Sequence, residues 1–298
     1  MKKYIYILAV AVAGLFLASC TEKVGTVPGN DAQPVVTVFN YNPTGVEYDT
    51  DTDQRVRFVN NGKATEAYYF VDKTADKAAA IEAEGEAAYI EKAIAQGKAI
   101  TFDESGMFET VITGMTGTYD ITSIAVNGSQ KVMRAATFKG IPWDPSFNIE
   151  GVYTITQAAL LAATGAAASY PAVLQRNLDN PNMYRIKGAF GQGSKLTFTY
   201  FPKEEGSSEA LVKTDKDGDS FTVLRVDKQD IPTLVIPEVG PAGICDVGLA
   251  LGDDSYITDM DYECGMYEDY YCFFQVRYYC SAGNIGWGWY DNFTPNEE

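Results

Sequence analysis

The sequence predicts a mainly β fold with two β-sandwich-like domains, the first of which carries a helical insert. Runs rich in β-branched and aromatic residues recur between turn residues, as at residues 35–39 and 55–59, and are typical of short strands. An apolar fraction of 46% is ordinary for a folded protein, and 298 residues are enough for two domains. One stretch rich in alanine, glutamate and lysine, residues 73–97, interrupts this pattern and favours helix.

The N-terminal residues have the pattern of an exported lipoprotein. Two lysines precede an uncharged, mostly apolar run at residues 4–17. A helix that spans a bilayer takes about 20 apolar residues, so this run is too short to cross and is typical of a signal peptide. It ends in Leu17-Ala18-Ser19-Cys20, which resembles a bacterial lipobox with Cys20 as the lipidated residue. The alternative is an ordinary signal peptide that has a cysteine nearby.

Residues 1–19 are therefore predicted to be the signal peptide, and residues 20–34 the lipidated cysteine and a flexible tether. The tether contains glycine, proline and polar residues and has no periodic pattern. Acyl chains on Cys20 would anchor the protein in the outer membrane without a membrane-spanning helix. Glu22 alone supplies an acidic residue just after the cysteine, so a periplasmic and an external orientation both stay open.

The first predicted domain covers residues 35–140. Further β patterns occur at residues 67–71, 99–102, 108–112, 118–126 and 132–138. Within the insert at residues 73–97, Gly85 marks a point where one helix can end and another begin. We expect the insert to cap one sheet, and the alternative is an element that contacts a partner.

Residues 110–132 resemble part of a fibronectin type III or immunoglobulin-like domain. Met115 and a short turn precede Tyr119, which opens a strand that alternates through residues 121–126. The resemblance implies a β-sandwich in which the Tyr119 hydroxyl binds the backbone at a corner between strands. It therefore gives Tyr119 a structural role. The helical insert departs from the family pattern.

Prolines in residues 141–145 separate this part from a second predicted domain, residues 146–298. Its β patterns lie at residues 149–156, 173–177, 183–186, 195–200, 221–226, 244–251 and 271–280, and a short helix is expected within residues 157–168. The Gly-x-Tyr opening at residues 151–153 and the segment at residues 181–186 resemble the C-terminal β domains of Bacteroides-type surface lipoproteins. The combined resemblance covers most of the mature chain and implies an outer-membrane lipoprotein whose C-terminal β domain has a poorly defined function.

Four cysteines lie near the C-terminus: Cys245, Cys264, Cys272 and Cys280. An exported protein can form disulfides, and a clustered, even set predicts two bridges. On one strand, at ~3.3 Å per residue, Cys272 and Cys280 would lie about 26 Å apart, which is beyond the reach of a bridge. We therefore expect 245–280 with 264–272, or else 245–272 with 264–280. Four buried thiols are the alternative, and the lack of C-x-x-C spacing and of histidine disfavours a zinc site.

Charge and composition exclude several functions. The chain has 40 acidic and 23 basic residues, and its net charge of −17 disfavours nucleic acid as a partner. Histidine is absent, which excludes Ser-His and Cys-His nucleophile pairs. Neither G-x-S-x-G nor a P-loop occurs, and Gly188, Gly191 and Gly193 lack dinucleotide-binding spacing. A carboxylate-only glycosidase remains chemically possible, although no pair of acidic residues stands out.

Three acidic loops carry the oxygen ligands that calcium prefers. They hold Asp49, Asp51 and Asp53; Asp215, Asp217 and Asp219; and Asp253, Asp254, Asp259 and Asp261. None has the spacing of an EF-hand. For the second loop the alternative is a β-hairpin turn, because Asp217-Gly218 is a strong turn signal. We expect no cofactor other than calcium at one of these loops.

Aromatic residues concentrate near the C-terminus, where Trp287, Trp289 and Tyr290 are candidates for ligand binding. On a strand, Trp287 and Trp289 point the same way across Gly288, whose missing side chain lets a ligand or another backbone approach. Sugar rings stack their C–H faces on such aromatic side chains. The alternative is that the tryptophans pack in the core. The even-numbered residues of the preceding strand are expected there: Phe274, Val276 and Tyr278.

Together these observations predict a non-catalytic lipoprotein of the outer membrane that binds glycans at the cell surface or assists their binding. Its predicted contacts are the membrane, through the lipid, and a glycan or an envelope protein. The alternative function is that of a structural or adhesive surface protein that contacts other proteins. A carboxylate-only glycosidase comes third.

Overall fold

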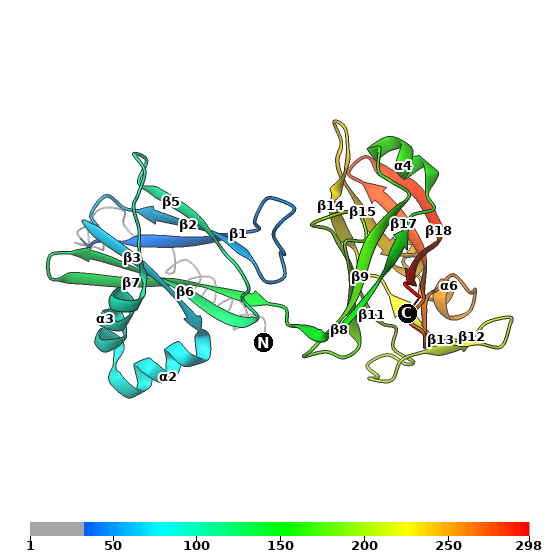
Figure 1. The fold of residues 1–298 in the computed structure, drawn as a ribbon, viewed down its shortest axis with the longest axis horizontal. Coiled ribbons are helices and arrows are strands. Elements are labelled where there is room, and N and C mark those ends of the chain that lie inside the picture. Colours follow the sequence, from blue (N-terminus) through cyan, green and yellow to red (C-terminus); the bar gives the residue numbers. More distant parts are fainter. Residues whose placement is uncertain (1–32, 298) are drawn as a thin grey trace, which may run out of the picture. The chain divides into compact units, whose positions relative to one another are not determined.

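The computed structural model describes residues 33–297, and its 51% strand against 14% helix confirms a mainly β protein. The predicted signal peptide, Cys20 and most of the tether lie outside the described residues. Two compact units are present (Figure 1). The first holds residues 33–40, 56–110 and 120–137, and the second holds residues 41–55, 111–119 and 138–297. The segment 138–297 begins near the predicted boundary between the two domains. Residues 41–55 and 111–119, from the first half of the chain, also belong to the second unit.

The first unit contains a three-stranded and a four-stranded sheet. The first sheet has the order β1 (Val36–Tyr41), β2 (Gln54–Asn60), β5 (Met107–Ile112), and the second has the order β4 (Lys98–Ala99), β3 (Glu66–Lys73), β6 (Gly117–Asn127), β7 (Gln130–Gly140). In β2, buried Val56 and Phe58 alternate with arginines, as expected of a strand with one face in the core. The Phe58 ring centroid lies 5.1 Å from that of Tyr69 in the other sheet. The unit is thus built of two layers of sheet.

Tyr119 does not make the bond that the resemblance implies. Its side chain is half-buried near the start of β6. No hydrogen-bond partner of its hydroxyl lies among residues 33–297. The expected tyrosine bond at a strand corner is therefore wrong for this chain.

The helical insert forms α2 (Thr74–Glu84) and α3 (Glu86–Gln96), which divide at Gly85, where φ is +87°. Helix α3 buries Tyr89 and Ala93 against Ile124 of β6. Lys77 of α2 is also buried, and its Nζ lies 3.1 Å from Oδ2 of Asp120 in the same strand. The insert therefore caps the four-stranded sheet, as the sequence predicts.

The strands of residues 143–297 all belong to one eleven-stranded antiparallel sheet that closes on itself. Eight strands form the closed cycle: β8 (Trp143–Thr154), β9 (Ser169–Asn177), β10 (Met183–Lys187), β11 (Lys195–Tyr200), β13 (Ser220–Arg225), β16 (Cys264–Tyr267), β17 (Cys272–Cys280) and β18 (Gly283–Pro295), which pairs again with β8. Three strands extend it: β12 (Val212–Thr214), β14 (Gln229–Ile236) and β15 (Gly240–Asp246). This closed sheet takes the place of the predicted second β-sandwich.

Side chains fill the interior of the cycle. The predicted core residues Phe274, Val276 and Tyr278 of β17 are fully buried, which confirms that prediction. They join Phe198 and Phe293 in one large apolar cluster. A cycle of eight strands leaves an interior about wide enough for side chains alone, so packing occupies the space that a wider cycle would leave to a ligand.

Three short helices complete the second unit: α4 (Ala158–Thr164), α5 (Val247–Leu251) and α6 (Ser255–Thr258). The predicted strand at residues 244–251 is wrong in its second half, where α5 lies. The cause is Asp246, whose side chain accepts a hydrogen bond from the Leu249 backbone N–H at 2.8 Å and so caps the helix. No helix within residues 33–297 is both long and apolar enough to cross a membrane.

The predicted disulfides are wrong, because all four described cysteines are free and the strand register keeps them apart. Cys272 lies opposite Met266, two residues along the strand from Cys264. Such diagonal neighbours are about 7–8 Å apart, beyond the usual span of a bridge. Cys245 lies opposite Arg277, three residues along β17 from Cys280. The alternative of four buried thiols is confirmed for three of the cysteines, and Cys280 is a free thiol that is half-buried.

We expect a thiol reagent to modify Cys245, Cys264 and Cys272 only once the fold opens, whereas half-buried Cys280 is open to it in the folded protein. Burial raises the pKa of the Cys245, Cys264 and Cys272 thiols, so in the folded protein they are both covered and protonated. Mass spectrometry after alkylation, without reductant, should find all four labelled in the unfolded protein. Recovery of any disulfide-linked peptide pair among them would contradict the register.

Candidate functional site

Strand β18 carries the three aromatic residues proposed for ligand binding, and a β-bulge turns its tryptophans outward. In the pairing with β17, Asp291 lies opposite Phe274. Trp289 lies opposite the next residue, Gln275, so Tyr290 between them has no partner. The extra residue switches the faces of the strand, because side chains alternate along it. Trp289 is accordingly 41% exposed, whereas Asp291 is fully buried.

Gly288 faces the interior and not a ligand. A Cβ atom there would lie 2.5 Å from Oδ2 of Asp291 and 2.9 Å from the ring of Tyr278. Internal packing therefore requires glycine at this position, which corrects the expectation that a ligand approaches here.

Trp287 and Trp289 belong to a row of four aromatic rings, Tyr256, Tyr262, Trp289 and Trp287, which we call the aromatic row. Neighbouring ring centroids are 6.2, 5.7 and 5.4 Å apart in that order. The two indole planes are 18° apart, so these rings stack. At the far end, the Arg277 guanidinium lies 5.9 Å from the Trp287 ring centre. The row is partly exposed, which argues against a core role for the tryptophans.

The backbone behind the aromatic row is fixed by hydrogen bonds. The carbonyl of Trp287 accepts from the Gln157 side-chain amide at 2.6 Å, and that of Trp289 from the Thr156 hydroxyl at 3.0 Å. Asp291 accepts from the backbone N–H of Thr156 at 2.6 Å. Burial raises the pKa of Asp291, although these hydrogen bonds oppose the rise. The two indole rings therefore project from a rigid strand.

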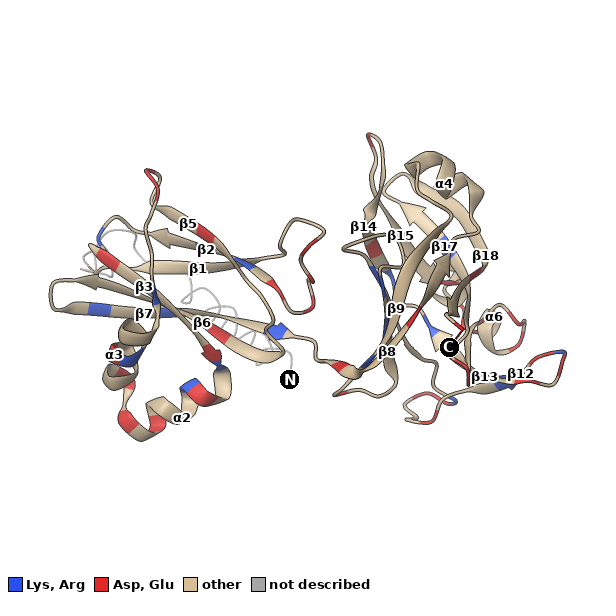
Figure 2. Ribbon diagram, in the orientation of Figure 1, with Lys and Arg blue, Asp and Glu red and all other residues tan. Residues whose placement is uncertain are grey.

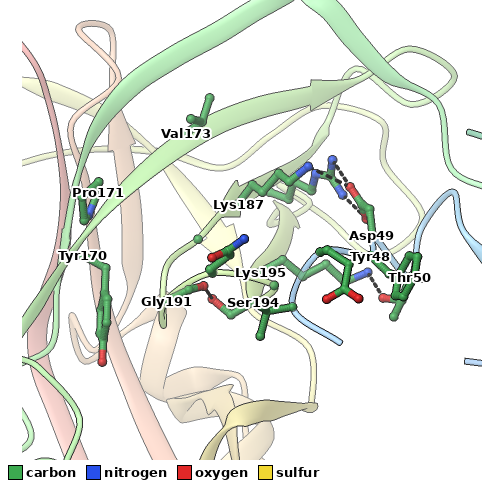
Figure 3. Close-up of a pocket in the computed structure, with 16 residues that line it drawn as sticks. Tyr48, Asp49, Thr50, Tyr170, Pro171, Val173, Lys187, Gly191, Ser194 and Lys195 are labelled. Carbon is green, nitrogen blue, oxygen red and sulfur yellow. Dashed lines mark hydrogen bonds and ion pairs between the residues drawn. The ribbon is translucent and has the colours of Figure 1, made fainter. Parts of the chain in front are cut away.

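A cavity of about 530 Å³ is also present in the second unit, beside the loop that holds residues 46–50 (Figure 3). Tyr170, Pro171 and Val173 of β9 line one side of it, and Figure 3 places Tyr48, Asp49 and Thr50 across from them. The turn between β10 and β11 lies between these walls. Gly193 in this turn has a φ of +81°, and a Cβ atom there would lie 2.7 Å from Cα of Val46. Glycine therefore allows the turn and the loop to approach each other closely.

Arg185 fixes the loop beside this cavity. The side chain is almost fully buried, with Nη1 2.6 Å from Oδ2 of Asp51 and Nη2 2.9 Å from Oδ2 of Asp49. The indole N–H of Trp143 donates to the same Asp51 oxygen at 3.0 Å. Lys195 pairs with the other oxygen of Asp51, and Lys187 lies 3.2 Å from Asp49. The predicted calcium ligands Asp49 and Asp51 are therefore neutralised by cationic side chains of this chain.

The other two acidic loops, red in Figure 2, each hold a carboxylate with partners inside the fold: Asp215 in one and Asp254 in the other. Asp215, Asp217 and Asp219 form the turn of the β12–β13 hairpin, which confirms the hairpin alternative. Asp215 accepts from the backbone N–H groups of Asp217 and Asp219 at 2.9 and 3.0 Å, and from the Tyr267 hydroxyl at 2.8 Å. Around α6, Asp254 pairs with half-buried Arg225 at 2.7 Å. Within residues 33–297, no three acidic or cysteine side chains gather as metal ligands would.

Sequence patterns missed both the extension of the aromatic row and the cavity. Tyr262 follows the acidic residues around α6, where the pattern pointed to an ion site and not to an aromatic surface. Lys187 and Lys195 flank the glycine-rich turn, and this arrangement was a usable signal for a polar cavity. The chain matches no family model, no curated protein and no solved structure.

The ion pairs of Asp49 predict a defined dependence of stability on pH. Burial alone would raise the pKa of Asp49, but the hydrogen bond and charge of Arg185, the Asp51 backbone N–H and the charge of Lys187 together lower the pKa from 3.8 to about 2. Ionised Asp49 therefore stabilises the fold above its unfolded-state pKa, by about 2 kcal/mol, and this contribution is lost as the pH falls towards 2.

In urea unfolding, Asp49→Asn should be less stable than the native protein at pH 7. The difference in unfolding free energy should shrink by roughly half between pH 5 and pH 3. Glu209→Gln, which changes a side chain that is 75% exposed, is the control and should give no such trend. A difference that stays constant over this range would contradict the assignment.

Proposed function

We propose that this protein is a non-catalytic lipoprotein of the outer membrane that binds glycans through the aromatic row and Tyr290. The observation that carries the proposal is the exposure of neighbouring aromatic side chains. Tyr290 is 62% exposed, and Tyr262 and Trp289 are each about 40% exposed. Exposed rings offer the faces on which sugar C–H groups stack, and the rings on the rigid strand β18 lose little side-chain order on binding.

The backbone of Tyr290 supports a functional role. Its φ is +64°, in the left-handed region that glycine or asparagine adopts more easily. A bulky residue there costs about 1–2 kcal/mol. Burial does not offset this cost, because most of the ring meets solvent. Strained residues of this kind concentrate at functional sites.

The acidic side chains near the aromatic row favour binding over hydrolysis. Glycoside hydrolysis needs two carboxyl groups that are free to face the sugar. Asp291 is buried and accepts from the Tyr278 hydroxyl at 2.6 Å. Asp261 and Glu263 both pair with Lys213, at 3.0 and 3.2 Å.

A protein-binding or adhesive surface is the second candidate function, and one observation favours it. Met260 and Leu251 are 52% and 45% exposed in the segment that carries the tyrosines of the row. The stacked indoles also cover part of each other's faces. Exposed apolar side chains that gather in this way are typical of contacts with other proteins.

Tyr290→Gly separates a binding role from a structural role. The substitution removes the ring and relieves the left-handed backbone, so stability should stay constant or rise. Binding should fall in a glycan-array screen if Tyr290 contacts sugar. Phe39→Ala, which removes an aromatic residue that is 43% exposed in the first unit, is the control and should bind as the native protein does. Unchanged glycan binding together with a lower melting temperature would make Tyr290 structural.

The proposal of a lipid anchor rests on Leu17-Ala18-Ser19-Cys20. It predicts that a protein without the Cys20 thiol moves to another cell fraction. Cys20→Ala removes the thiol that accepts the lipid, and the apolar run is too short to span the bilayer. The variant should therefore leave the membrane fraction. A cleaved variant that still sediments with membranes would contradict lipidation at Cys20.

A further inference from the structure

The cavity beside residues 46–50 combines an aromatic wall with polar side chains that still have free hydrogen-bond donors or acceptors. Tyr170, Pro171 and Val173 supply the apolar side. Lys187 reaches across from β10, and the charged loop lies opposite (Figure 3). A volume of about 530 Å³ lies within the range of cavities that bind small molecules.

Lys187 has hydrogen-bond donors available to a ligand. Its side chain is 51% exposed, and Asp49, at 3.2 Å, is its one partner among residues 33–297. An ammonium group carries three N–H donors, so two remain. Lys195, by contrast, already contacts both Asp51 and Thr50 and is held against the loop.

Acceptors line the same cavity. Glu47 is exposed, and its carboxylate has no hydrogen-bond or ion-pair partner within the described part of the chain. The Gln192 side-chain amide, also in the lining, is likewise without a partner within residues 33–297 and can both donate and accept. The cavity thus presents free donors and free acceptors together.

The charges around the cavity balance. Arg185, Lys187 and Lys195 face the carboxylates of Glu47, Asp49 and Asp51. An anionic ligand would meet Glu47, and a cationic ligand would meet Lys187. A wholly apolar ligand would displace water from these groups without replacing the hydrogen bonds that the water makes. A neutral ligand with many hydroxyl groups satisfies donors and acceptors alike, and one apolar face of its ring can lie on Tyr170.

We propose that this cavity binds a neutral sugar residue, with ring hydroxyls between Lys187 and Glu47 and a C–H face against Tyr170. The proposal rests on the proposed function in that it assigns a second binding site for the same class of ligand. It adds a site that is distinct from the aromatic row and that selects uncharged sugars.

Calorimetric titration of the full chain with glucose, galactose, mannose, N-acetylglucosamine and their disaccharides tests this site, with glucuronate as the charged counterpart. At least one neutral sugar should bind, and glucuronate should bind more weakly than glucose. Lys187→Met should weaken binding on the order of tenfold, because it removes hydrogen bonds from a charged donor. Lys216→Met, at a side chain that is 89% exposed in the β12–β13 hairpin, is the control and should bind normally.

Glu47→Ala is the second variant. Glu47 lies on an exposed loop and has no partner within the described residues, so its removal leaves the Arg185 contacts intact. The substitution should also weaken binding. The proposal is overturned if no neutral sugar binds, or if both cavity variants bind as the native protein does. Loss of binding in Tyr290→Gly but not in Lys187→Met would place the sugar on the aromatic row, which supports the proposed function and overturns the cavity site. Loss in Lys187→Met alone supports the cavity site.

Discussion

The pairing of β16 with two strands is the constraint on which the second unit depends. Its residues pair with β13 on one side and with β17 on the other, so the eight-stranded cycle has no open edge at this point. The enclosed space is filled by large side chains such as Phe198, Phe274 and Phe293. The inward side chains therefore pack against one another, and only outward side chains and turns can contact a ligand. The aromatic row and the cavity both follow this rule.

Two local features then decide which side chains are exposed at the two proposed binding sites. At β18, one unpaired residue, Tyr290, reverses the alternation so that a buried aspartate follows two outward tryptophans. At the cavity, Arg185 holds Asp49 and Asp51 in place, and removal of Arg185 would take from both carboxylates the one buried cation that they share. In each case a buried polar group positions the exposed groups. The buried groups fix the positions of the neighbouring side chains, and the exposed groups are available for binding.

Local patterns in the sequence sufficed wherever neighbouring residues determine the structure. The division of the insert at Gly85, the hairpin turn at Asp217-Gly218 and the core positions of β17 all depend on residues close together in the chain. Features set by strand register were not predictable in this way. The cysteines were expected to pair because they cluster in sequence, but the register of β15, β16 and β17 separates them. Arg185 and Asp49 are distant in sequence, so no local pattern links them.

The most direct test of glycan binding at the aromatic row follows the indole N–H signals of the protein by nuclear magnetic resonance. The chain has three tryptophans, so there are three such signals, and Trp143 is identified as the one that donates to Asp51. During titration with a glycan that the protein binds, the signals of Trp287 and Trp289 should shift with the fraction bound. Saturable binding that leaves both of these signals unmoved would contradict the central claim.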